Sequence, residues 1–103
     1  MSEKTFSYVM TDIAESDLEE IFGYLLDETK DIEIAEQVIE KITESIIELV
    51  NFPYKYESLT EQFLREKGYR KMTIYNYNVI YRVVEERNEL VILRIVHGKR
   101  KYY

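Results

Sequence analysis

The chain has no cysteine, one histidine and one proline, and these shortages exclude several kinds of protein. Without cysteine it forms no disulfide and carries out no thiolate chemistry. One histidine without cysteine does not supply the usual ligands of a structural zinc site, so no metal or cofactor is expected. No apolar run approaches the ~18 residues of a membrane span, and residues 1–4 lack the pattern of a signal peptide. We therefore expect a cytoplasmic protein that does not associate with a membrane.

The chain does have enough apolar sequence for one core, and its charge is divided between its two ends. A length of 103 residues with 46% apolar content fits a single globular domain over residues 1–103. Residues 1–64 hold 16 acidic and 4 basic side chains, whereas residues 65–103 hold 4 acidic and 10 basic ones. The net charge of −6 averages these two surfaces. The basic half is where an anionic or acidic partner is expected to dock.

The acidic half is predicted to form a short strand and two helices. Residues 5–10 alternate between apolar and polar side chains, which is typical of a half-buried strand. Thr11 or Asp12 can cap the helix that follows, in which apolar residues recur at helical spacing. A second apolar stripe spans residues 35–50, and Pro53 ends it because proline disfavours helical geometry in the preceding residue. A short link joins the two helices, so we expect an antiparallel hairpin.

The basic half is predicted to form a three-stranded meander. Aromatic and β-branched residues favour strands over residues 69–75, 77–85 and 89–96. Residues 54–67 indicate a loop with at most one helical turn near residues 61–64. Strands joined by short links pair antiparallel, and the first strand is expected at an edge or beside the last strand. The predicted fold class is α+β, with the order β-α-α-β-β-β and an antiparallel sheet covered on one face by the helix hairpin.

The C-terminal segment is the first candidate site. The pKa of histidine suits proton transfer near neutral pH, and His97 is the one histidine. Arg100 could neutralise a phosphate, and Tyr102 or Tyr103 could stack on a base or donate a proton. The alternative is a solvated basic tail whose terminal aromatic pair folds back onto the sheet.

The predicted strands supply the second candidate site. Arg70, Lys71, Arg82 and Arg94 could align on the sheet face that the helices leave uncovered, as a seat for a nucleic acid or an acidic peptide. The alternative is that these cations only keep an exposed sheet face soluble. The strand register, and with it the face of Arg82 and Arg94, stays open at this point.

Short motifs follow one another along nearly the whole chain in a recognisable order. They are Ala14–Ile21, Ala35, Leu49–Pro53, Gly68–Met72, Tyr77–Val83 and Ile92–Arg100. In this order and spacing they resemble the RelE/ParE superfamily of type II toxin–antitoxin toxins, also called plasmid-stabilisation proteins. The resemblance implies the fold predicted above and a growth inhibitor held inactive by a cognate antitoxin. That antitoxin would wrap the sheet and helices in a hetero-oligomer.

One branch of this superfamily, the RelE-like branch, implies catalysis. Its members cut mRNA on the ribosome without a metal, by attack of a ribose 2′-OH on the adjacent phosphate, with arginines that stabilise the transition state. On that template Arg70 and Arg100 match the basic residues. His97, Tyr102 or Tyr103 would transfer the proton.

The other branch, the ParE-like branch, implies no catalysis. Its members bind and poison DNA gyrase, and they lack the complete nuclease set. Here Asn78 and Met72 stand where RelE-like nucleases commonly carry basic residues, which favours the ParE-like function. An mRNA endoribonuclease is the alternative, and an inactive or decayed binding module is a third. The residues expected to bind a partner are Arg70, Lys71, Arg82, Arg94, Lys99, Arg100, Lys101 and Tyr103.

Overall fold

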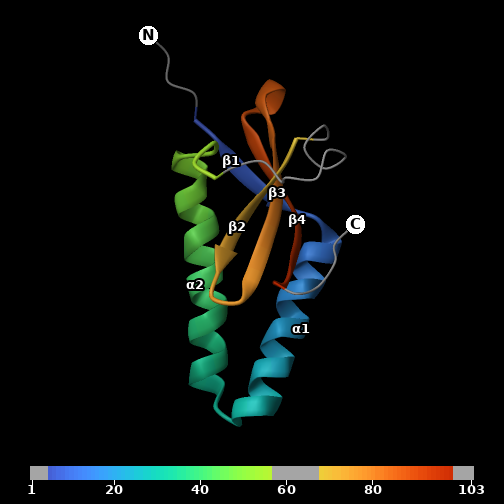
Figure 1. Cartoon of the computed structure of the whole chain (residues 1–103), viewed down its shortest axis with the longest axis vertical. Helices are drawn as coiled ribbons and strands as arrows, with labels where there is room; N and C mark the ends of the chain where they lie inside the picture. The colour runs from blue at the N-terminus through green and yellow to red at the C-terminus, as the bar shows by residue number, and fades with distance from the viewer. Residues whose placement is uncertain (1–4, 57–67, 99–103) are drawn as a thin grey trace.

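The chain folds into a four-stranded sheet with two long helices on one face (Figure 1). A computed structural model describes residues 5–56 and 68–98. The elements are β1 (Ser7–Met10), α1 (Asp12–Thr29), α2 (Ile32–Asn51), β2 (Tyr69–Ile74), β3 (Tyr77–Val84), a 3₁₀ turn η1 (Glu85–Arg87) and β4 (Glu89–His97). The predicted order β-α-α-β-β-β is confirmed. The helical turn predicted near residues 61–64 and the candidate residues from Lys99 to Tyr103 lie outside the described residues.

Thr11 fixes the start of α1 and joins it to the sheet. Its hydroxyl oxygen accepts a hydrogen bond from the Ala14 amide at 3.0 Å, so Thr11 rather than Asp12 is the cap. The same hydroxyl donates to the Leu93 carbonyl at 3.0 Å, and the Thr11 amide donates to the Ile92 carbonyl at 3.1 Å. The first turn of α1 is therefore held against β4.

The second helix packs its apolar stripe on the sheet. The Asp31 carboxylate caps α2 by accepting from the Glu33 amide at 2.9 Å, and the helix ends at Asn51, just before the capping residue Phe52 and Pro53, as predicted. α1 and α2 form the expected antiparallel hairpin (Figure 1). The stripe packs against sheet residues to form the core. The fully or almost fully buried residues of this core include Ile42, Ile46, Leu49, Met72, Val79, Tyr81, Leu90, Ile92 and Ile95.

The sheet is mixed, with the strand order β1-β4-β3-β2. The predicted antiparallel pairing holds for β2 with β3 and for β3 with β4, whereas β1 pairs parallel with β4. The prediction of an antiparallel sheet is therefore corrected at this one pair. β1 lies both at an edge and beside the last strand. A parallel pair needs a long connection, and here the helix hairpin and two strands separate β1 from β4.

Cross-strand register assigns each side chain to one of two faces, because paired residues lie on the same side of the sheet. Met72 pairs with Val79, and both belong to the core beneath the helices, on what we call the helix face. Lys71 pairs with Ile80 on the opposite side, which we call the outer face. A register shift between Ile80 and Tyr81 leaves Leu93 as an extra residue in β4.

Candidate functional site: the basic strand residues and a pocket beside the first helix

The four basic strand residues do not form one group. Arg82 pairs with Tyr69, and Arg94 pairs with Ile80, so both lie with Lys71 on the outer face. Arg70 pairs with Tyr81, a core residue, and therefore lies on the helix face. The proposed alignment of cations on the uncovered face thus omits Arg70.

Arg70 anchors the segment that follows α2. One of its guanidinium nitrogens donates to the Tyr56 carbonyl at 2.6 Å, and its guanidinium carbon lies 5.0 Å from the ring centroid of Tyr54. The Tyr54 hydroxyl donates to a carboxylate oxygen of Glu85, and this hydrogen bond, with a smaller contribution from burial, raises the pKa of Tyr54 above its ordinary value. Arg70 therefore has local partners that hold residues 52–56 against the end of the sheet.

Arg94 is tied to α1 by a two-point ion pair with Asp17. Its Nε and one terminal nitrogen donate to the two carboxylate oxygens at 2.9 and 3.0 Å. The Asp17 side chain is 6% exposed, and it also accepts from the Ile95 amide at 2.8 Å. The hydrogen bond to Asp17 raises the pKa of Arg94. This ion pair joins α1 to the part of β4 that extends beyond β1.

The two positions that depart from the nuclease pattern have different structural roles. Met72 is 1% exposed on the helix face, so this position belongs to the core. Its neighbour Lys71 is the residue that points to the outer face. Asn78 is buried, and its side-chain oxygen accepts from the Thr73 hydroxyl at 2.9 Å. Neither residue leaves room for a cation without a change in the packing around it.

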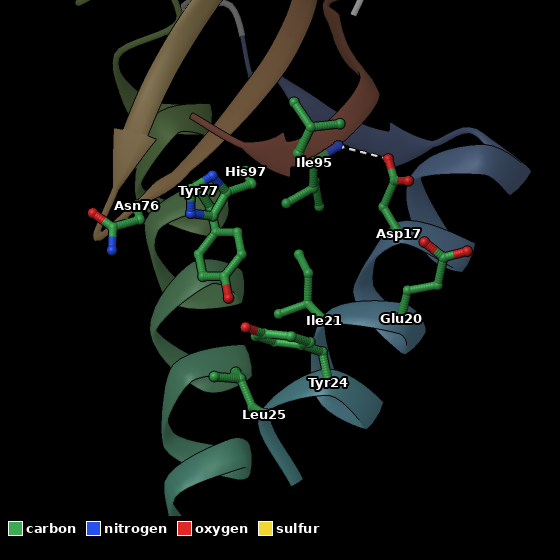
Figure 2. A pocket seen from close by; sticks show the side chains of 10 residues that line it. Asp17, Glu20, Ile21, Tyr24, Leu25, Asn76, Tyr77, Ile95 and His97 are labelled. Atoms are coloured by element: carbon green, nitrogen blue, oxygen red, sulfur yellow. Dashed lines mark hydrogen bonds between the residues drawn. The ribbon is translucent and has the colours of Figure 1, made fainter. Parts of the chain in front are cut away.

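A pocket of about 620 Å³ lies between α1 and the end of the sheet (Figure 2). α1 contributes Asp17, Glu20, Ile21, Tyr24 and Leu25, and the sheet side contributes Asn76, Tyr77, Ile95, Val96 and His97. This is where the structure places the candidate His97, whose ring meets the Tyr77 ring edge-on with centroids 6.0 Å apart. Burial, with a smaller effect from Tyr24, raises the pKa of Tyr77.

Sequence reasoning missed the α1 side of this pocket. In the sequence Asp17 is one of several acidic residues in the first turns of the predicted helix, where they complement the helix dipole, so it does not stand out as a site residue. It occupies the same helix face as Ala14 and Ile21, both buried, and an acidic residue within an apolar stripe was the available signal. Tyr24 and Tyr77 gave no comparable signal, since tyrosines occur throughout the chain.

The described residues contain neither a metal-binding cluster nor a membrane-spanning helix. Within residues 5–56 and 68–98, no three histidine, cysteine or acidic side chains gather where they could hold a metal ion. No helix in these ranges has the length and apolar character needed to cross a membrane.

A family model decides the relationship of the chain. The model of the "ParE toxin of type II toxin-antitoxin system, parDE" matches residues 8–102. The chain belongs to the ParE toxin family. It is thus a type II toxin of the RelE/ParE superfamily, as the motif order indicated. A search of curated proteins gives no match.

Solved structures of ParE and RelE systems share the fold of this toxin. The chromosomal ParDE system of P. aeruginosa aligns with a TM-score of 0.77 and 21% identity, over 94% of this chain and 100% of that one. The RelBE2 toxin–antitoxin complex of Mycobacterium tuberculosis aligns with a TM-score of 0.62 and 21% identity, over 90% and 98%. The isolated E. coli RelE toxin gives a TM-score of 0.63 and 12% identity, over 93% and 87%.

Proposed function

We propose that residues 1–103 form one toxin domain that acts in the cytoplasm by binding and poisoning DNA gyrase, as in the ParE-like branch. A cognate antitoxin binds the toxin in a hetero-oligomer and neutralises it. The match to a ParE model and the similarity to the ParDE and RelBE complexes support this proposal. The observation that carries it is the dispersal of the basic strand residues.

A nuclease that uses no metal needs cations that converge on one phosphate, because they must stabilise the charge that develops there. Arg70 lies on the helix face with Tyr54 and Tyr56 as partners, whereas Arg94 is held by Asp17. These two guanidinium groups therefore serve the fold. This arrangement favours a toxin that acts by protein binding over one that cleaves RNA.

The outer face is the surface that we assign to the antitoxin. Lys71 and Arg82 are exposed there, and Lys99, Arg100, Lys101 and Tyr103 follow β4 in the sequence. A segment with acidic side chains would complement this charge. Both toxin hypotheses require such a partner, so its binding tests the toxin identity and not the cellular target.

Controlled expression in a bacterial host tests the proposed target. We expect growth arrest, accumulation of cleaved DNA, and inhibition of gyrase supercoiling by the purified chain, with intact mRNA on translating ribosomes. Co-expression of the antitoxin should restore growth. DNA topology and mRNA integrity are read from the same cultures, so the two mechanisms are compared at the same level of toxin.

Two other outcomes would contradict the proposal. Cleavage of ribosome-bound mRNA without a metal, lost in Arg100→Ala, His97→Gln and Tyr102→Phe, would establish the RelE-like nuclease instead. Unaffected growth at a level of folded chain confirmed by immunoblotting and protease resistance would indicate an inactive binding module.

A further inference from the structure

The pocket beside α1 has the composition of a binding site for one positively charged side chain. Among the described residues that line it are two carboxylates, Asp17 and Glu20, and neither a lysine nor an arginine. Arg94 and the Ile95 amide already engage the Asp17 carboxylate. Glu20 is exposed and forms no hydrogen bond or ion pair within the described part of the chain, although its charge acts on Arg94. Arg94 balances one of the two carboxylates, so one negative charge is left over among the described residues here.

Two aromatic rings line the pocket together with this charge. Tyr24 is 62% exposed on α1, and Tyr77 reaches the same space from β3, as Figure 2 shows. The Tyr77 ring also contacts the His97 ring, nearly perpendicular to it and with the centroids 6.0 Å apart. The negative face of a tyrosine ring attracts a cation, and a planar guanidinium can stack on it.

The floor of the pocket is apolar. Ile21 is buried, Leu25 is half-buried, and Ile95 closes the sheet side. An arginine side chain has a matching distribution of properties, since an aliphatic stem carries a guanidinium at its end. The stem would contact Ile21 and Leu25 while the guanidinium reaches Glu20 and a tyrosine ring.

We propose that this pocket receives an arginine side chain from a protein partner, with Glu20 as its ion-pair partner and Tyr24 and Tyr77 as its stacking surface. The identification of that partner with the antitoxin rests on the proposed function. The affinity of the pocket for a guanidinium does not, because it depends only on the residues of the isolated chain. Charge complementarity and the aromatic walls select arginine over an apolar anchor, which would leave the Glu20 charge unpaired.

The isolated chain can be titrated with Nα-acetyl-arginine methylamide while amide and tyrosine ring signals are followed by NMR. We expect shifts at Glu20, Tyr24 and Tyr77. The citrulline analogue, which has the same shape without the charge, should give much smaller shifts. Glu20→Gln and Tyr24→Leu should each weaken binding about two- to fivefold, the size expected for an exposed ion pair or cation–π contact.

Glu19→Gln is the matched control, because Glu19 is exposed on the same helix but does not line the pocket. It removes the same charge and should leave the affinity unchanged. Equal shifts with arginine and citrulline, equal losses in Glu19→Gln and Glu20→Gln, or no shift at the pocket would each overturn the proposal. A lysine analogue that binds as tightly as arginine would overturn the assigned stacking role of the guanidinium.

A second measurement separates this proposal from the proposed function. The affinity of the toxin for its antitoxin is measured by calorimetry with the original chain, Glu20→Lys and Glu19→Lys. We expect at least a tenfold loss only in Glu20→Lys. If guanidinium binding fails while growth arrest and antitoxin binding are intact, the pocket assignment is wrong and the function stands. If the pocket binds arginine but growth is unaffected, the proposed toxin activity fails alone.

Discussion

The two faces of the sheet are built from the same strands, yet they differ in whether a charged side chain can be exposed there. Lys71 and Met72 are neighbours in β2, and the first is exposed on the outer face while the second is 1% exposed in the core. Alternation along the strand places them on opposite sides. A basic residue within one of these strands is thus available to a partner only when its register position is on the outer face.

Arg70 and Arg94 add to this comparison, because partners within the fold hold both guanidinium groups and neither is available to another protein. Arg70 lies on the helix face, at the end of the sheet. There its guanidinium contacts the Tyr54 ring and donates a hydrogen bond to the Tyr56 carbonyl. Arg94 lies on the outer face but is tied to Asp17 from α1. The second half of the sequence therefore carries more positive charge than its surface presents to a partner.

The largest expected effect comes from opposite substitutions at the neighbouring positions 71 and 72, which test the difference between the two faces. Met72→Lys places a charge in the core and should cost more than about 4 kcal/mol of unfolding free energy, enough to unfold a marginal domain. Lys71→Met makes the reverse change on the outer face and should stay within about 0.5 kcal/mol. Urea unfolding monitored by circular dichroism measures both. Similar losses in the two variants would contradict the assigned faces.

Removing Asp17 tests the link between α1 and the outer-face arginine. Asp17→Ala leaves the Arg94 guanidinium and the Ile95 amide without their acceptor and should cost about 3 kcal/mol. Glu19→Ala on the same helix is the control and should change the stability by less than about 0.5 kcal/mol. Thermal and urea unfolding give the two values. A loss no larger than that of the control would show that the ion pair contributes little.

The Tyr81 hydroxyl on the helix face should make the fold sensitive to alkali. It is fully buried and has no hydrogen-bond partner among the described residues, and burial raises the pKa of Tyr81 from 10.0 to about 12. Above pH 10 the unfolded chain loses this proton more readily than the folded chain. Stability should therefore fall by about 1.4 kcal/mol per pH unit until about pH 12.

Tyr81→Phe removes this contribution and provides the measurement. At pH 7 it should be close to neutral or stabilising, since no described residue is a partner of the lost hydroxyl. Between pH 10 and 12 its unfolding free energy should fall less steeply than that of the original chain. Tyr75→Phe, which removes a hydroxyl from an exposed ring, is the control for the loss of a phenol. Equal alkaline slopes in all three chains would contradict the prediction.

The smallest expected effect is the difference in unfolding free energy between the loss of an arginine from one face and the loss of an arginine from the other. Arg70→Ala removes the contact with the Tyr54 ring and the hydrogen bond to the Tyr56 carbonyl, and should cost about 1–2 kcal/mol. Arg82→Ala should cost less than about 0.5 kcal/mol and instead weaken antitoxin binding. Chemical unfolding and calorimetric titration measure the two properties separately. A stability loss in Arg82→Ala without a loss of affinity would reverse the assigned roles.

Much of the fold could be predicted because its signals are local. The apolar stripes, the cap at Thr11 and the stop at Pro53 each act within a few residues, and they located both helices. The parallel pairing of β1 with β4 has no local signal. The sequence predicts the first strand at an edge or beside the last strand, but its direction depends on how two distant segments of the chain meet.

The roles of the site residues were harder to predict, because they depend on contacts across the fold. Alternation gives the face of Arg70 once the core side of β2 is known, but the shift near Ile80 disturbs the count in β4. The partners Asp17 and Arg94 are 77 positions apart in the sequence. An acidic residue in an apolar stripe indicates that a cation is needed nearby, but it does not identify which one.

The double role of the Thr11 hydroxyl has a consequence for the synthesis of this toxin. The hydroxyl that begins α1 also donates to the Leu93 carbonyl in β4, the last element that the ribosome releases among those described. β1 likewise has no partner strand until Glu89–Ile92 have been made. Pairing between distant segments requires the closure of a long loop, which costs conformational entropy and slows folding. A nascent toxin would therefore complete its sheet only after β4 has left the ribosome, and chains that end before β4 would lack the finished binding surface.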